Sequence, residues 1–180
     1  MGTDIHAVFQ SKKMSGWVDV DTTWDQRRHY FLFAWLAGVR NGFGFAGVRM
    51  HEPITPISEP RGLPKDFARD DEDYMGEHNF SWLTAEEILA APRPGVTRRY
   101  GVLDRDVYEA WDKKSCPSSY SGDVSGRDVV KHTPENITPE TTHVQCEWVE
   151  DDSELDYFVQ EVRRLRDEHS EVRLVFGFDS

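Results

Sequence analysis

Apolar and polar residues alternate at the N-terminal end of the chain. Within residues 3–10, every second side chain from Ile5 to Phe9 is apolar, which is the period of a half-buried β-strand. A turn over residues 12–16 follows, and residues 17–21 alternate again. Together these segments predict an antiparallel hairpin.

The C-terminal end changes between strand and helix patterns. Residues 143–149 alternate as a strand, a stripe of apolar side chains at helical spacing comes next, and residues 172–178 return to the strand pattern. The stripe consists of Leu155, Phe158, Val159, Val162 and Leu165. We therefore expect a strand, a helix and a strand, with a right-handed crossover if the two strands run parallel in one sheet.

Two more helices are expected between these ends. Residues 24–39 are apolar on most sides, which is typical of a nearly buried helix, with Asp25 as its N-cap and the Asn-Gly pair at residues 41–42 as its stop. Further along, Thr84 and Glu87 have the spacing of a capping box. A short helix should therefore begin at Thr84.

Residues 95–142 show little periodicity. They include a candidate helix over residues 100–114 and a loop-like stretch over residues 116–139, so we expect a loop-rich insertion. The other elements define an α+β fold, in which the N-terminal hairpin and the C-terminal strand–helix–strand unit form a small mixed or antiparallel sheet. This sheet would pack against the central buried helix, with long irregular loops, in a single domain over residues 1–180.

Charge narrows the choice of partners. The chain has 21 Lys and Arg against 33 Asp and Glu, a formal net charge of -12, which argues against nonspecific nucleic-acid binding and against anionic membranes. The same charge suits a partner protein with a basic surface, and the alternative is that it serves solubility alone. No apolar run of about 18 residues and no leader pattern is visible, so a cytoplasmic protein is expected. Cys146 has the sequence context of a buried core thiol.

Glycines and prolines shape the loop over residues 40–64, and basic side chains are spread along it. Such side chains can clamp a phosphate or a carboxylate by bidentate pairing. The candidate ligand-binding residues are Arg40, Arg49, His51 and Arg61. The alternative is that the arginines pair with some of the 33 acidic side chains. The loop lacks the preceding strand and the lysine of a P-loop.

Asp4 and His6 project from the same face of the first expected strand, which is a geometry that metal sites use. His78 and Asp179 are candidates for further ligands if this strand lies beside the C-terminal one. A divalent metal ion held there would activate water, so a metal-dependent hydrolase or phosphodiesterase using Asp4, His6 and His78 is one functional alternative. In the other interpretation, Asp4 and His6 hydrogen-bond to each other or to nearby backbone.

Short segments spread over the chain follow a recurring pattern. They are MGTDIH at residues 1–6, YFLFAWLAGVRNG at 30–42, PRGLP at 60–64, His78 with SWLT at 81–84, and VRLVFGFD at 172–179. Together these segments resemble a family of small uncharacterised proteins from bacteriophages and prophages. The resemblance implies a phage or prophage gene without an established activity.

This resemblance favours an accessory protein that acts by binding in the host cytoplasm. It would inhibit a host factor or an antiviral defence component, or it would bind a small, nucleotide-like anion. The metal-dependent hydrolase is the first alternative, and a phage structural or morphogenesis component is the second.

Overall fold

The computed structural model describes residues 2–44, 47–67 and 75–180, and it confirms the α+β class. The elements are β1 (Asp4–Lys13), β2 (Gly16–Asp19), α1 (Tyr30–Ala37), β3 (His78–Thr84), α2 (Ala85–Ala90), β4 (Thr97–Asp104), α3 (Arg105–Ala110), β5 (Lys131–His132), the 3-10 turn η3 (Pro134–Asn136), β6 (His143–Glu150), the 3-10 turn η4 (Asp152–Leu155), α4 (Asp156–Glu168) and β7 (Val172–Asp179). Among the described residues, no helix has the length and apolar character needed to cross a membrane.

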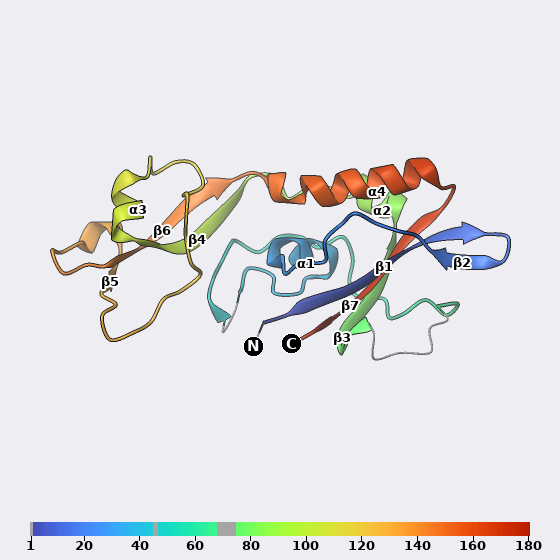
Figure 1. Cartoon of the computed structure of the whole chain (residues 1–180), viewed down its shortest axis with the longest axis horizontal. Helices are drawn as coiled ribbons and strands as arrows, with labels where there is room; N and C mark the ends of the chain where they lie inside the picture. Colours follow the sequence, from blue (N-terminus) through green and yellow to red (C-terminus); the bar gives the residue numbers. More distant parts are fainter. Residues whose placement is uncertain (1, 45–46, 68–74) are drawn as a thin grey trace.

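The first sheet has four strands in the order β2-β1-β7-β3, and all neighbours are antiparallel. The predicted hairpin is present as β1 and β2, although β1 continues to Lys13 and leaves a turn of only two residues. β1 also pairs with β7, from Asp4 opposite Asp179 to Ser11 opposite Val172. The strands from the two ends of the chain are therefore neighbours at the centre of the sheet (Figure 1).

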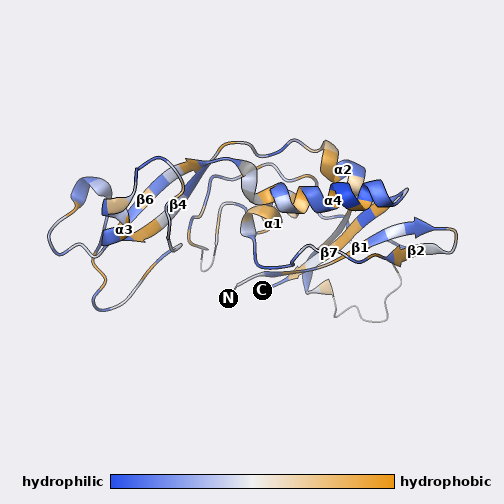
Figure 2. Ribbon diagram, turned by 45° about the horizontal axis from the view of Figure 1, so that its top comes forward, coloured by the Kyte–Doolittle hydropathy of each residue, from blue (hydrophilic) through white to orange (hydrophobic). Residues whose placement is uncertain are grey.

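The main core lies between this sheet, α1 and α4. Every residue of α1 from Phe31 to Ala37 is buried, and Phe33 meets Phe178 of β7 edge to face at 5.1 Å between ring centroids. The apolar stripe on α4 is present, because the side chains of Phe158, Val159, Val162 and Leu165 are buried. Figure 2 shows hydrophilic and hydrophobic residues together along α4, as expected of a helix with one buried face.

The first helix is shorter than predicted. It begins at Tyr30 and ends at Ala37, and the left-handed φ of 69° at the next residue, Gly38, closes it before residues 41–42. Asp25 is not an N-cap but pairs with Arg27. Residues 24–29 are held along β1 instead, because the amide of Gln26 accepts from Ala7 N at 2.9 Å and donates to Ala7 O at 2.8 Å.

The predicted capping box at the start of α2 is confirmed. The hydroxyl of Thr84 accepts from the backbone N of Glu87 at 3.1 Å, and the carboxylate of Glu87 accepts from the backbone N of Thr84 at 2.8 Å. Two backbone donors at the helix start are satisfied in this way. The cap fixes the point at which β3 turns into α2.

The second sheet has three strands in the order β4-β6-β5, with β4 antiparallel and β5 parallel to β6. β6 and β7 therefore lie in different sheets, and the condition for a right-handed crossover is not met. The prediction of a helix over residues 100–114 is wrong. The first part of this range belongs to β4, and α3 spans only Arg105–Ala110. The division into one domain with an insertion at residues 95–142 stays a prediction.

A small core supports the second sheet. It consists of the buried residues Leu103, Val144, Cys146 and Trp148. Burial raises the pKa of the Cys146 thiol to about 11, in agreement with its predicted place in a core. In Figure 1 this sheet lies at one end of the elongated molecule, α1 lies between the two sheets, and α4 extends over the first sheet.

Candidate functional site

The pairing of β1 with β7 brings the predicted metal ligands to one end of the first sheet. His6 Nε2 lies 2.8 Å from Asp179 Oδ2, and the two side chains are 36% and 38% exposed. The backbone N of Asp4 donates to the other oxygen of Asp179 at 3.3 Å. The contact with His6 is the main cause that lowers the pKa of Asp179. Asp179 thus stays anionic and orients the imidazole of His6.

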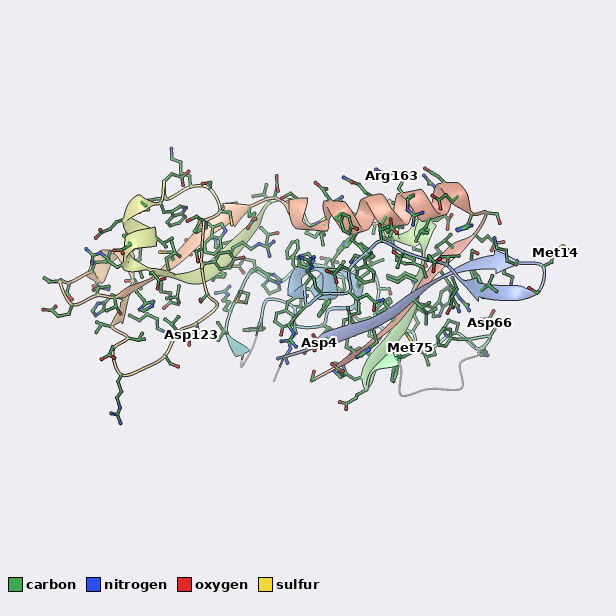
Figure 3. All side chains as sticks on the ribbon, viewed as in Figure 1. Asp4, Met14, Asp66, Met75, Asp123 and Arg163 are labelled. Atoms are coloured by element: carbon green, nitrogen blue, oxygen red, sulfur yellow. The ribbon has the colours of Figure 1, made fainter. Side chains whose placement is uncertain are left out.

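Asp4 and His78 have partners of other kinds. Arg28 donates from Nε and Nη2 to the two oxygens of Asp4 at 2.9 and 2.7 Å, and Figure 3 shows Asp4 at the end of β1 near the chain termini. His78 contacts the side-chain oxygen of Asn79 at 2.7 Å and the hydroxyl of Ser180 at 3.0 Å. Within the part of the chain that the structure describes, no group of three or more His, Cys, Asp or Glu side chains is placed to hold a metal ion.

Arg40 belongs to the same polar cluster at the end of the sheet. Its Nε donates to the buried hydroxyl of Thr3 at 2.7 Å, and that hydroxyl lies 3.0 Å from the hydroxyl of Ser180. The backbone N of Thr3 donates to the hydroxyl of Tyr30 at 3.2 Å. Arg40 therefore connects the C-terminal side of α1 to the ends of β1 and β7.

Arg49 and Arg61 pair with carboxylates, as the alternative interpretation of the loop predicted. Arg49 makes two hydrogen bonds to Glu52, at 2.9 and 2.8 Å. Arg61 lies 2.8 Å from Glu87 and is the main cause that lowers the pKa of that carboxyl. The three arginines of residues 40–64 thus have three different sets of partners.

His51 is the candidate residue that the fold buries most deeply, at 1% exposure. Its ring meets Phe31 of α1 edge to face at 5.1 Å, and a β-bridge joins its backbone to Arg99 of β4. Its Nδ1 lies 2.7 Å from the carbonyl oxygen of Glu52. Because a carbonyl only accepts, Nδ1 carries a proton. His51 therefore lies where α1 meets the second sheet.

A cavity of about 200 Å³ opens at this meeting point. We call it the interlayer cleft, and its lining includes His29, Phe31, His51, Arg99, Tyr120 and Trp148. The guanidinium carbon of Arg99 lies 3.9 Å from the ring centroid of Phe31, and its Nε lies 3.6 Å from a carboxylate oxygen of Glu150. Arg99 is only 6% exposed. None of the described residues that line the cleft is acidic.

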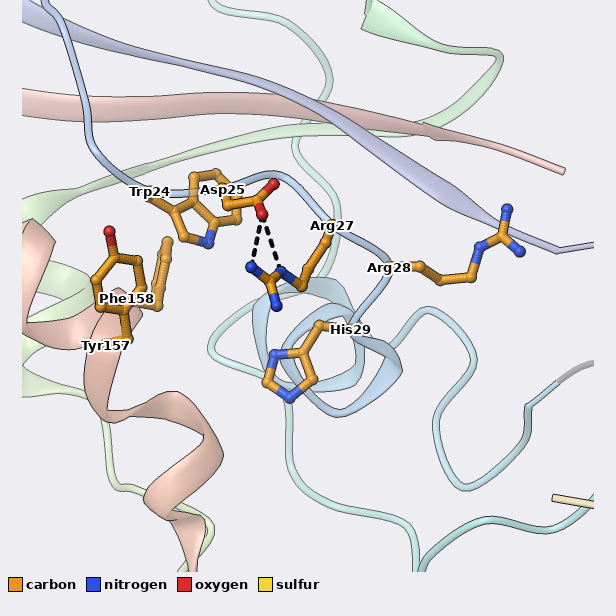
Figure 4. Close-up of a pocket in the computed structure, with 7 residues that line it drawn as sticks. All are labelled: Trp24, Asp25, Arg27, Arg28, His29, Tyr157 and Phe158. Atoms are coloured by element: carbon orange, nitrogen blue, oxygen red, sulfur yellow. Dashed lines mark hydrogen bonds and ion pairs between the residues drawn. The ribbon is translucent and has the colours of Figure 1, made fainter. Parts of the chain in front are cut away.

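A second cavity of about 400 Å³ adjoins the interlayer cleft through Arg28 and His29. We call it the outer pocket; Trp24, Asp25, Arg27, Tyr157 and Phe158 complete its lining. Figure 4 shows Arg27 turned toward Asp25, at 2.7 Å, and the side chain of Arg28 extending away from the pocket toward β1. The outer pocket therefore combines an aromatic wall with one exposed ion pair.

His29 and Arg99 line the interlayer cleft but were not among the site residues predicted from the sequence. Arg27, Arg28 and His29 form a basic triplet just before the buried helix, but the prediction placed them inside that helix. Arg99 lies in the stretch with little periodicity. The signal that could have indicated Arg99 was its spacing along β4. It lies an even number of positions from Thr97 and from Leu103, and both of these residues are buried.

The fold and the cleft define an α+β protein with a small basic cavity between α1 and the second sheet. Comparisons with protein-family models, with curated proteins and with solved structures give no match.

Proposed function

We propose that the protein acts by binding a small anion of the nucleotide class in the interlayer cleft and the outer pocket. The observation that carries this proposal is the pair of buried basic side chains, His51 and Arg99, on a cavity with no acidic residue in its described lining. This occurs in a chain with a net charge of -12. A basic cavity in an acidic protein selects for anions locally, while the rest of the surface repels polyanions such as nucleic acids.

The chemistry of Arg99 supports an anionic ligand. Arg99 is 6% exposed, lines the cleft and is always charged, and its Nε lies 3.6 Å from a carboxylate oxygen of Glu150. An anion in the cleft would be attracted by this buried positive charge. Charge-assisted hydrogen bonds to phosphate or carboxylate are about twice as strong as neutral ones, and the low dielectric of a buried site strengthens them further.

The aromatic walls support a ligand with a flat apolar part. The interlayer cleft, at about 200 Å³, has room for a phosphate or a carboxylate group. The outer pocket adds about 400 Å³ beside Trp24, Tyr157 and Phe158. Such rings offer faces and edges against which a nucleobase can pack. A nucleotide would place its phosphate near Arg99 and its base in the outer pocket.

The resemblance to phage proteins supports an accessory role in the host cytoplasm. By sequestering a nucleotide-like ligand there, the protein would inhibit a host factor or a defence component that depends on it. Direct binding to a host protein with a basic surface is the second form of this hypothesis, and it rests on the net charge of -12. The metal-dependent hydrolase is less well supported, because a metal ion could use Asp4 only after displacing Arg28.

Titration of the protein with AMP, with inorganic phosphate and with adenosine tests the proposal by calorimetry. We expect AMP to bind more tightly than phosphate, and adenosine to bind least. Arg99→Met should weaken AMP binding by at least about tenfold, since a hydrogen bond to a charged group contributes about 1.5–3 kcal/mol. Arg98→Met is the matched control, because Arg98 is the next residue on β4, is 49% exposed and pairs with Glu147 outside the cleft.

Circular dichroism and thermal melting would establish that each variant is folded. If Arg99→Met does not fold, His29→Gln replaces a half-buried residue of the same cleft and should also weaken AMP binding. Equal affinity of the cleft variants and Arg98→Met would overturn the proposal, as would the absence of AMP and phosphate binding to the unaltered protein.

A further inference from the structure

The second sheet carries another cavity, of about 590 Å³, between β4, α3, η3 and β6. Its lining includes the rings of Tyr100, Tyr108 and Trp111 and the carboxylates of Glu135 and Glu147. None of these residues lines the interlayer cleft or the outer pocket. Aromatic rings together with carboxylates form the environment that binds organic cations.

A cation from the same chain already contacts two of these rings, those of Tyr108 and Trp111. The ammonium nitrogen of Lys113 lies 3.9 Å from the ring centroid of Tyr108 and 5.5 Å from that of Trp111. It also donates to the carbonyl oxygens of the same two residues, at 2.9 Å for Trp111. Ring faces and carbonyl oxygens therefore meet around one ammonium group.

The backbone around Lys113 holds it in this place. Its φ of 63° lies in the left-handed region, which non-glycine residues seldom adopt. The preceding residue, Asp112, accepts hydrogen bonds from the backbone N of Lys114 at 2.7 Å and of Ser115 at 2.9 Å, and from the hydroxyl of Ser115. The turn is thus fixed by Asp112, and the side chain of Lys113 can leave the rings without unfolding it.

We propose that this cavity binds the ammonium group of a lysine side chain on a basic protein partner, and that Lys113 is an internal surrogate which the partner displaces. Charge complementarity supports this occupant, because the chain has a net charge of -12. Glu135 is exposed, and a hydrogen bond from Thr133 is the main cause that lowers its pKa, so it stays anionic near the incoming cation. Glu147 already pairs with Arg98.

Displacement of Lys113 predicts a distinctive result. In the unaltered protein one ammonium group replaces another, so the gain in binding is small. Removal of the Lys113 ammonium leaves the rings and carbonyl oxygens for the ligand alone. A substitution that removes a charged group from the protein should therefore increase its affinity for a lysine side chain.

The test uses Lys113→Met and its matched control Lys114→Met. Lys114 is exposed and does not line the cavity, and both changes alter the net charge equally. The probe is Nα-acetyl-lysine N-methylamide, followed by NMR through the indole N–H of Trp111, which donates to Ser115 O at 2.8 Å. We expect Lys113→Met to bind the probe at least about fivefold more tightly than Lys114→Met does.

Further variants keep the result decisive. If Lys113→Met fails to fold, Lys113→Gly vacates the same cavity and suits the left-handed backbone. Glu135→Gln, added to the Lys113 variant, should weaken binding about twofold. Equal affinity of the Lys113 and Lys114 variants, or equal binding of the neutral Nε-acetylated probe, would overturn the proposal. Tighter binding of putrescine than of the lysine probe would overturn its assignment to a protein partner.

Discussion

The two sheets differ in the size of the core that supports them. The first packs against α1, α2 and α4 through buried residues drawn from both ends of the chain. The second has a core of four buried residues, Leu103, Val144, Cys146 and Trp148. Yet the second sheet carries Arg99 and the aromatic residues that line the cavity around Lys113. The first sheet thus has the larger packed core, while the lightly packed second sheet contributes residues to both the interlayer cleft and the cavity around Lys113.

A matched pair of core substitutions tests this difference and should have the largest effect. Leu174 in β7 and Leu103 in β4 are both 0% exposed. We expect Leu174→Ala to lower the free energy of unfolding by about 4 kcal/mol and Leu103→Ala by about 2–3 kcal/mol, because a site in a small core relaxes more easily around a cavity. Urea unfolding measures both. Equal losses would contradict the difference between the two cores.

A buried carboxylate next to the first sheet should give the second largest effect. Glu161 of α4 is 4% exposed; it accepts from the backbone N of Thr23 at 2.7 Å and from Arg164 at 2.8 Å. The hydrogen bond from Arg164 is the main cause that lowers the pKa of Glu161 to about 2, from its ordinary 4.5. Because the folded-state pKa is depressed, the stabilisation is complete above pH 4.5 and is lost as the pH falls toward 2.

Urea unfolding at several pH values measures this contribution. Between pH 5 and pH 2, the free energy of unfolding of the unaltered protein should fall by about 2 kcal/mol more than that of the Glu161→Gln variant. Solvent around the half-exposed Arg164 keeps this difference below the value that the whole pKa shift would give. Glu147→Gln, in the exposed pair with Arg98 on the second sheet, is the control and should behave as the unaltered protein does. Identical pH profiles for Glu161→Gln and the unaltered protein would refute the prediction.

The helix caps should give the smallest effect. Thr84 caps α2 beside the first sheet through its hydroxyl, whereas Asp104 before α3 makes no side-chain cap hydrogen bond and is 71% exposed beside His143. We expect Thr84→Ala to lower the free energy of unfolding by about 1 kcal/mol, and Asp104→Ala by no more than about 0.5 kcal/mol. Thermal melting compares the two; a larger loss for Asp104→Ala would reverse the expected order.

Local patterns were enough to predict much of the fold. The hairpin, the stripe on α4, the capping box and the last strand each depend on residues close together in sequence. The strand β4 was not predicted, because its inward positions include Thr97, Arg99 and Gly101 in place of regularly spaced apolar residues. The start of α1 was misplaced because Gln26 bonds to the backbone of β1, a contact that periodicity does not report.

The contacts of the candidate site also fall into two groups, those that the sequence could indicate and those that it could not. The meeting of His6 with Asp179 follows from strand pairing, which the sequence suggested as a condition. The contact of Arg28 with Asp4 and the burial of Arg99 against Phe31 depend on how distant elements pack. Such contacts are decided by tertiary structure, so residue type and spacing alone did not indicate them.

The pairing of β1 with β7 also determines when the protein can fold during its synthesis. Asp4 lies opposite Asp179. The central pair of strands therefore cannot form until nearly all of residues 4–179 have left the ribosome. At the usual rate of about 5–20 residues per second, β1 and β2 wait on the order of ten to thirty seconds for their partner. During that time the free edge of β1 is exposed to other chains. A messenger RNA truncated before the codons of β7 yields a product whose first sheet lacks the strand that joins β1 to β3.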